Sequence, residues 1–154
     1  MRAALAVSAP FIASPASDSV GFLPLTTERT YPTELAAAVA RGAVVVDIRT
    51  SAERTVQGTL PGALAIDAAL LTRRLDPAAG AESLALAVDH DVEWVVVSAD
   101  GPAAHRAVAS LQEIGLRRAT GLVGGYAAIK TAGLVDAVTR AQHIAEDVAR
   151  VTAH

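Results

Sequence analysis

The sequence predicts one α/β domain with a mainly parallel sheet covered by helices on both faces. Its 154 residues suit a single compact domain, and a hydrophobic fraction of 52% supplies material for a buried core. Two apolar runs, at 43–49 and 93–98, are bounded by glycine or polar residues and are typical of strands covered on both faces. Segments with a helical spacing of apolar residues separate such runs, and this alternation indicates βαβ units.

The first half of the chain begins with a segment that lacks periodicity. Residues 1–28 contain three prolines, so we expect an N-terminal arm with at most one short strand. After the arm, Thr30 can cap a helix, Pro32 suits its first turn and Gly42 ends it. The elements expected next are a strand over 43–49, a helical turn over 51–57, a strand over 64–66 and an irregular helical segment over 68–91 that breaks at Asp76-Pro77.

The second half alternates strand and helix more clearly. A strand over 93–98 leads to a helix that has Pro102 in its first turn and Gly115 at its end. A short strand within 117–125 and a short helix over 126–133 follow. The last helix carries an apolar stripe that we expect to pack on the domain rather than to form a dimer seam. The stripe consists of Leu134, Val138, Ala141, Ala145 and Val148, with Ile144 and Val151 beside it.

Composition argues against several classes of function. The chain has no cysteine, which removes disulfides, thiolate metal sites and thiol catalysis. Its four histidines show no paired spacing, so we expect no metal site and no cofactor. The net charge is −3 without a long basic run, and no apolar stretch reaches ~18 residues, so we expect neither nucleic-acid nor membrane binding. The first residues resemble a signal peptide only weakly, and we expect a cytoplasmic location.

Three stretches, taken in order, resemble the rhodanese-like domain family. Residues 44–63 (VVVDIRTSAERTVQGTLPGA) are similar to the family's strand followed by D-x-R and G-H-[IL]-P-G-A. Residues 94–115 (WVVVSADGPAAHRAVASLQEIG) are similar to its strand, active-site loop and helix, and residues 119–134 (ATGLVGGYAAIKTAGL) to its closing L-x-G-G-x-x-x-W segment. The resemblance implies a rhodanese-like fold with a central, mainly parallel five-stranded sheet. The boundaries expected are an arm over 1–28, a rhodanese-like domain over 29–134 and a C-terminal amphipathic helix over 135–154.

Some residues match structural positions of the family. Asp47 and Arg49 match the D-x-R pair; two residues apart on one strand, they share a face, and we interpret them as charges that hold the fold. Pro61 and Gly62 match the turn that the family places beside its active site. Gly124 and Gly125 match the family's glycine pair, which is needed where backbone must approach closely or take positive φ.

The active-site loop is where the sequence departs from the family. In the family, a cysteine opens a six-residue loop, takes sulfane sulfur as a persulfide and passes it to an acceptor. Backbone N–H groups of the loop hold the anionic sulfur. Ser98 occupies that position, and a serine hydroxyl stays protonated at neutral pH and cannot carry a persulfide. The binding loop that follows Ser98 consists of Ala99, Asp100, Gly101, Pro102, Ala103 and Ala104.

Other replacements in this loop weaken its fit to an anion. Pro102 has no backbone N–H, and Asp100 adds negative charge where an anion would be held. Ala103 and Ala104 offer no side-chain donor. Phosphatases of this fold need an arginine at the position of Ala104, so the sequence argues against that activity as well.

We therefore interpret the domain as catalytically inactive, with a binding or regulatory role. Two alternatives stay open: a sulfurtransferase, if Ser98 replaces a native cysteine, and a sensor of small anions that bind the N–H groups of Gly101 and of Ala103 to His105. A serine hydrolase is disfavoured, because His105 lies inside a predicted helix and the G-x-S-x-G elbow is absent. The expected partner is a protein or a small anion, and we expect a monomer or a weak homodimer.

Overall fold

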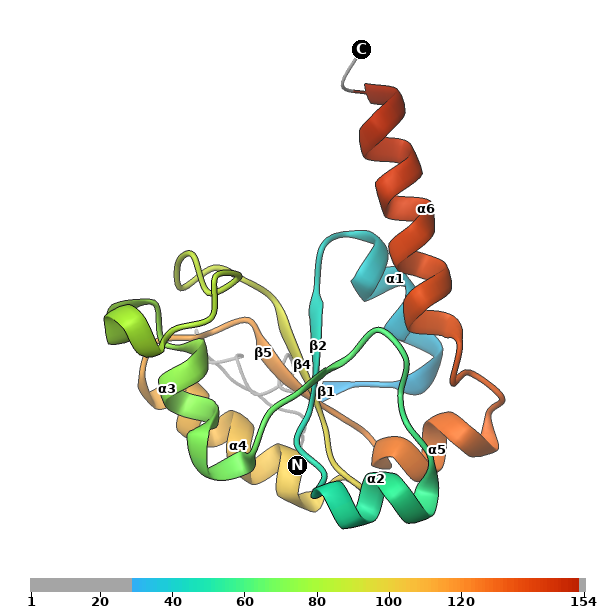
Figure 1. The fold of residues 1–154 in the computed structure, drawn as a ribbon, viewed down its shortest axis with the longest axis horizontal. Coiled ribbons are helices and arrows are strands. Elements are labelled where there is room, and N and C mark those ends of the chain that lie inside the picture. Colours follow the sequence, from blue (N-terminus) through green and yellow to red (C-terminus); the bar gives the residue numbers. More distant parts are fainter. Residues whose placement is uncertain (1–28, 153–154) are drawn as a thin grey trace, which may run out of the picture.

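The computed structural model describes residues 29–152, which form a five-stranded sheet with helices on both faces (Figure 1). Neighbouring strands pair in parallel throughout, in the order β1-β5-β4-β2-β3. The predicted α/β fold with a central, mainly parallel five-stranded sheet is thus confirmed. The strands are β1 (Arg29–Thr30), β2 (Val44–Asp47), β3 (Leu64–Ala65), β4 (Trp94–Val97) and β5 (Ala119–Leu122).

The helices form two layers around this sheet (Figure 1). One layer contains α1 (Leu35–Ala40), α5 (Gly125–Thr131) and α6 (Ala137–Thr152), and the other contains α3 (Leu71–Leu75) and α4 (Pro102–Glu113). The remaining helical segments are α2 (Ser51–Gln57) and the 3₁₀ helices η3 (Pro32–Glu34), η4 (Ala68–Leu70) and η5 (Pro77–Glu82).

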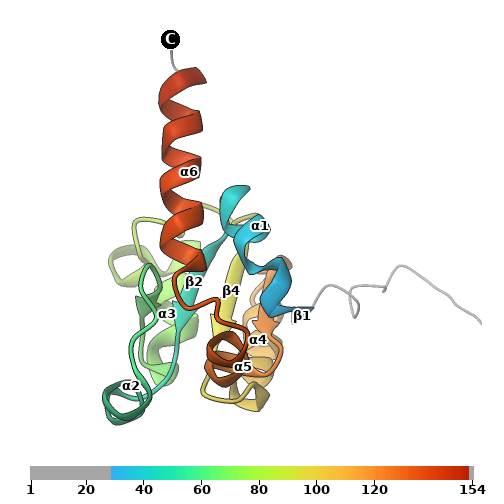
Figure 2. The same cartoon turned by 90° about the vertical axis from the view of Figure 1, so that its right-hand side faces the viewer.

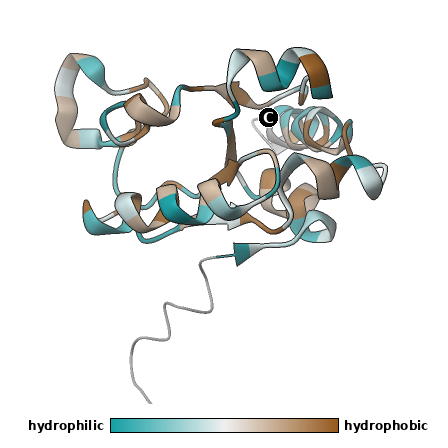
Figure 3. Ribbon diagram, turned by 90° about the horizontal axis from the view of Figure 1, so that it is seen from below, coloured by the Kyte–Doolittle hydropathy of each residue, from teal (hydrophilic) through white to brown (hydrophobic). Residues whose placement is uncertain are grey.

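Side chains of the central strands alternate between the two layers, as the pleat of a strand requires. Val45, Val95 and Val97 are buried with α1, α5 and α6, whereas Val46 and Val96 are buried with α3 and α4. Figure 3 shows these apolar strands, in brown, lying between the helices. A strand buried on both faces needs an uninterrupted apolar run, and the valine runs of β2 and β4 supply it.

The role predicted for Thr30 as a helix cap is wrong. Thr30 lies in β1, where it pairs with Leu122 of β5, and its buried hydroxyl lies 2.6 Å from that of Thr120. Tyr31 instead precedes the first helical residue, and its N–H donates to Glu34 Oε1 at 2.9 Å. Thr30 therefore belongs to a strand because it pairs with β5, although local capping rules assign it to the start of the helix. The short strand expected within residues 1–28 lies outside the described residues.

The last helix begins at Ala137, and its first half packs on the domain. Val138 and Ala141 are buried against the core that includes α1. The second half of α6 extends past the end of α1 in both views (Figures 1 and 2), and there Ile144 is 57% exposed and Val151 74% exposed. No helix within 29–152 is long and apolar enough to span a bilayer.

Candidate functional site

Ser98 lies directly after β4, at the start of the loop that leads into α4. Its side chain points into that loop, because Oγ accepts the N–H of Gly101 at 3.0 Å and the N–H of Ala104 at 3.2 Å. The residue is only 3% exposed. Two backbone donors that could hold an anion at a helix start are therefore occupied by a neutral hydroxyl of the same loop.

The start of α4 accounts for the other backbone donors of the loop. Gly101 has a φ of +113° in the position before the helix, and its carbonyl accepts the N–H of His105 at 3.1 Å. Pro102 is the first residue of α4, a position whose N–H has no partner within the helix, so the missing donor costs the helix nothing. Of the N–H groups considered for an anion, only that of Ala103 has no acceptor within the described part of the chain.

The glycine pair before α5 packs directly against this loop. A Cβ on Gly125 would collide with the carbonyl oxygen of Ser98 and lie 2.7 Å from the amide nitrogen of Asp100. The next two residues of α5 hold the loop by backbone bonds, from Tyr126 N–H to Ser98 O at 2.8 Å and from Ala127 N–H to Ala99 O at 3.1 Å. Close backbone contact of this kind excludes any side chain at residue 125.

Asp47 and Arg49 form a buried ion pair at the end of β2. The guanidinium donates to both carboxylate oxygens, with Nη2 2.8 Å from Oδ2 and Nε 3.0 Å from Oδ1, and the side chains are 0% and 2% exposed for Arg49 and Asp47. The Cζ of Arg49 lies 3.9 Å from the centre of the Tyr126 ring, and Nη1 of Arg49 donates to Gln57 Oε1 at 3.2 Å. The pair thus connects β2 and α2 to α5, the helix on which the Ser98 loop rests.

The turn at Pro61 and Gly62 lies against α6. A Cβ on Gly62 would come within 2.8 Å of Val138 Cγ1, and the carbonyl of Gly62 accepts a hydrogen bond from Gln142 Nε2 at 3.0 Å. The structure therefore brings Asp47, Arg49, Gly124 and Gly125 together with the loop through α5, and it places the Pro61-Gly62 turn under the last helix.

Tyr126 was missed by sequence reasoning, although it links the ion pair to the loop. Its ring stacks on Arg49, its N–H bonds Ser98, and its hydroxyl donates to Thr59 O at 3.4 Å. The available signal was an aromatic residue directly after two glycines in a chain with only 3% aromatics.

Among the residues that the structure describes, no general base accompanies the serine. The ring of His105 packs on Gly121, where Nδ1 would lie 2.7 Å from an added Cβ, and none of the hydrogen bonds among residues 29–152 joins this ring to Ser98. The described residues also contain no cluster of three or more acidic or histidine side chains that could hold a metal ion. Activation of a serine needs a base that is itself oriented by a third group, and residues 29–152 do not form this arrangement around the loop.

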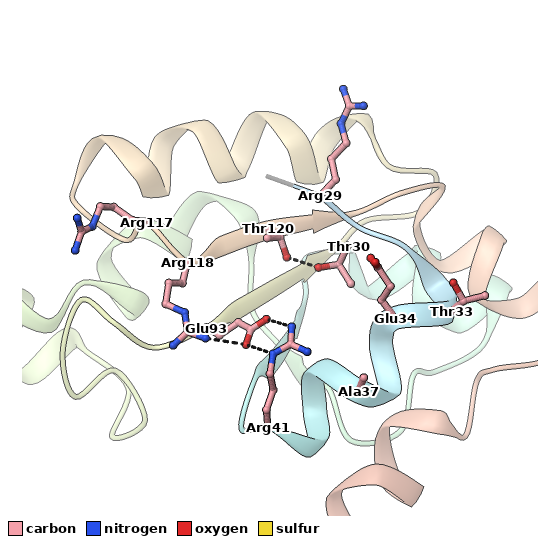
Figure 4. A pocket seen from close by; sticks show the side chains of 10 residues that line it. All are labelled: Arg29, Thr30, Thr33, Glu34, Ala37, Arg41, Glu93, Arg117, Arg118 and Thr120. Carbon is pink, nitrogen blue, oxygen red and sulfur yellow. Dashed lines mark hydrogen bonds and ion pairs between the residues drawn. The ribbon is translucent and has the colours of Figure 1, made fainter. Parts of the chain in front are cut away.

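A separate hollow of about 620 Å³ lies at the opposite end of β4 (Figure 4). Glu93 is among its lining residues, and its carboxylate accepts hydrogen bonds from Arg41 Nη2 at 2.8 Å and from Arg118 Nη2 at 3.2 Å. The two arginines nearest the hollow are thus committed to an internal carboxylate. Figure 4 shows the other two arginines of the lining, Arg29 and Arg117, pointing away from it.

Comparison with known proteins gives one family and several solved structures. A family model described as a rhodanese-like domain matches residues 31–132. No curated protein matches the chain.

Three solved structures illustrate the likeness. A protein of unknown function from Rhodopseudomonas palustris, described as a possible tyrosine phosphatase, is 22% identical, with 77% of this chain and 96% of that chain covered and a TM-score of 0.60. The human single-domain sulfurtransferase TSTD1 is 26% identical, with coverages of 68% and 96% and a TM-score of 0.56. A rhodanese-related protein from Thermoplasma volcanium is 19% identical, with coverages of 69% and 93% and a TM-score of 0.54. The first and third likenesses concern the fold alone.

Proposed function

This chain belongs to the rhodanese-like domain family, and we propose that it is a catalytically inactive member with a binding or regulatory role. The observation that carries the proposal is the state of Ser98: its hydroxyl is buried and accepts two backbone N–H bonds of its own loop. In the family, the same position holds the sulfur that receives and passes on the sulfane group. Here a neutral oxygen satisfies the donors instead.

Three features of the loop argue against transfer chemistry. Ser98 is buried, so a sulfur donor cannot reach its hydroxyl without loop movement. No base accompanies it within the described residues, so it stays protonated. The exposed carboxylate of Asp100, two residues on, repels an anionic donor such as thiosulfate.

The retained support of the loop favours a role in binding. The Asp47–Arg49 pair, Tyr126 and Gly125 support the loop through α5, so the surface around it is formed in advance. A preformed surface loses little conformational entropy on association, which favours recognition of a partner. We infer a protein partner on this ground, and we keep the cytoplasm as the expected location from the sequence of the N-terminal segment.

A sulfurtransferase remains the second candidate, and two observations favour it. The N–H groups of Gly101 and Ala104 already point at the side-chain atom of residue 98, as a thiolate at that position would need. TSTD1, a single-domain sulfurtransferase, shares the fold at 26% identity. A sensor of small anions has less support, because three of the four N–H groups it would use are engaged within the loop and helix.

Formation of thiocyanate from thiosulfate and cyanide separates these candidates. We expect no thiocyanate from the unaltered chain and none from Ser98→Cys, because Asp100 and the missing N–H of Pro102 remain. Turnover by the unaltered chain would refute the inactive assignment. Turnover by Ser98→Cys alone would favour the sulfurtransferase and show that only the nucleophile is lacking. For the anion sensor, the test is the melting temperature with sulfate, phosphate or thiosulfate, and we expect no increase with any of them.

A further inference from the structure

The second half of α6 presents an apolar surface that nothing in the described chain covers. Ile144 and Val151 are 57% and 74% exposed, although both lie on a helix that is polar elsewhere along its exposed side. Beside Ile144 is an apolar groove of about 350 Å³ between α1 and α6. The residues that line it include Ala36, Ala37 and Ala40 of α1 and Ala137, Ala141 and Ile144 of α6. We propose that a second copy of this chain occupies the groove, with the two α6 helices antiparallel about a two-fold axis at Ile144.

The spacing of apolar residues on α6 fits such a pairing. At 3.6 residues per turn, Ala137, Ala141, Ile144 and Val151 fall on one line along the helix. Val151 and Ala137 lie equally far from Ile144, on either side of it. When two copies pair antiparallel with Ile144 on the axis, each Val151 therefore reaches the partner's groove at the level of the partner's Ala137, which is itself only 6% exposed. The larger side chain from the free end of one helix then enters the alanine-lined groove of the other, and the contact is self-complementary, as a two-fold interface requires.

The charges beside this line agree with an antiparallel pairing and not with a parallel one. Arg140 and Asp147 are exposed and lie on the same flank of the line, close to equal distances on either side of Ile144. A two-fold axis perpendicular to both helices brings equal flanks together, so Arg140 of each copy meets the partner's Asp147, and the pair forms twice. A parallel pair would bring opposite flanks together and lose both contacts.

The pair that Asp147 makes within its own helix does not oppose this. Arg150 Nη1 lies 3.0 Å from Asp147 Oδ1, but both side chains are more than two-thirds exposed. An ion pair of that exposure stabilises a helix only slightly, so the carboxylate of Asp147 can also pair with the guanidinium of the partner's Arg140.

The size of the contact predicts a weak dimer. The line from Ala137 to Val151 is about 21 Å long at 1.5 Å per residue. A helix pair of this length, with the groove, buries less than the ~800 Å² per partner of a standard interface. We therefore expect association in the micromolar range, dependent on concentration, rather than an obligate dimer.

Charge reversal on α6 tests the pairing. The full-length chain, Arg140→Asp, Asp147→Arg and an equimolar mixture of these two variants would be measured by sedimentation velocity from about 5 to 500 µM. Each single variant places like charges opposite each other twice, and we expect its dissociation constant to rise by about tenfold. In the mixture, one copy carries only acidic and the other only basic residues at the two positions, so a heterodimer of nearly original affinity should form. Glu146→Arg is the matched control, because it makes the same charge change on the opposite face of α6 and should leave the dimer unchanged.

Three results would overturn the proposal. The first is an unaltered chain that stays monomeric at every concentration, which leaves the groove to a different occupant. The second is a dimer that tolerates both single reversals as well as it tolerates Glu146→Arg. The third is a mixture that associates no better than either variant alone, which would exclude the antiparallel register. Circular dichroism of each variant confirms that the helix content is unchanged, since every substituted side chain is exposed.

Discussion

Gly125 supports the Ser98 loop, and its replacement by alanine tests how tightly the two segments pack. The residue has a φ of +62°, and an added Cβ would collide with the carbonyl oxygen of Ser98 and lie 2.7 Å from the amide nitrogen of Asp100. Both contacts are with backbone atoms, which cannot turn aside as the end of a flexible side chain can. The loop must therefore shift as a unit, and the two backbone bonds that join it to α5 are lost or stretched.

The expected loss of stability can be summed from these terms. A left-handed backbone costs a residue with a Cβ about 1–2 kcal/mol. Each of the two strained hydrogen bonds contributes about 0.5–1.5 kcal/mol. Alanine also lowers the conformational entropy of the unfolded chain, which stabilises the folded state by about 0.4–1 kcal/mol. We expect Gly125→Ala to lower the free energy of unfolding by about 3 kcal/mol, and the melting temperature by roughly 10 °C for a domain of this size.

Urea unfolding followed by circular dichroism measures this loss, and Gly133→Ala is the matched control. Gly133 has a similar φ of +72°, but nothing lies within 4 Å of the Cβ that alanine would add. Its replacement should cost about 1 kcal/mol, from the backbone term alone. Equal losses for the two variants would refute the reasoning, because they would show that the loop does not press on Gly125.

Two further sets of substitutions test the parts of the site around the loop. Ser98→Ala leaves the N–H groups of Gly101 and Ala104 without their acceptor, so we expect unfolding to become about 1–3 kcal/mol easier and the two amides to exchange faster with solvent; unchanged amide exchange would mean that the hydroxyl is not their partner. Arg49→Ala and Asp47→Ala each strand a buried charge and should cost about 3–5 kcal/mol in urea unfolding, whereas the double variant should cost clearly less than their sum. Additive losses would contradict the pairing.

The sheet was largely predictable from the sequence, because its central strands carry their own signal. The valine runs of β2 and β4 and the Pro102 start of α4 are local features, and the structure places these elements where the sequence did. One of the two outer strands was not predictable: β1 is two residues long and exists only through its pairing with β5. A pairing between segments so distant in sequence leaves no local pattern to detect.

The candidate site was predictable in position but not in detail. The order of the motifs places Ser98 between a strand and a helix, and the structure has it there. The hydrogen bond from the loop to the Ser98 hydroxyl and the stacking of Arg49 on Tyr126 are details of this kind. They depend on contacts between β2, β4 and α5, which the periodicity of the sequence does not reveal. Similarly, the stripe on α6 gave no hint that Ile144, beside it, would stay exposed where Val138 and Ala141 are buried.

An inactive domain requires the Ser98 hydroxyl to be a buried structural group and not a reactive one. The most direct measurement is the intact mass of the unaltered chain after exposure to a fluorophosphonate, a reagent that labels activated serines. We predict no gain in mass, because the hydroxyl is buried, protonated and held by Gly101 and Ala104. A single adduct located at Ser98 would contradict the account, since it would require an exposed hydroxyl and a base beside it.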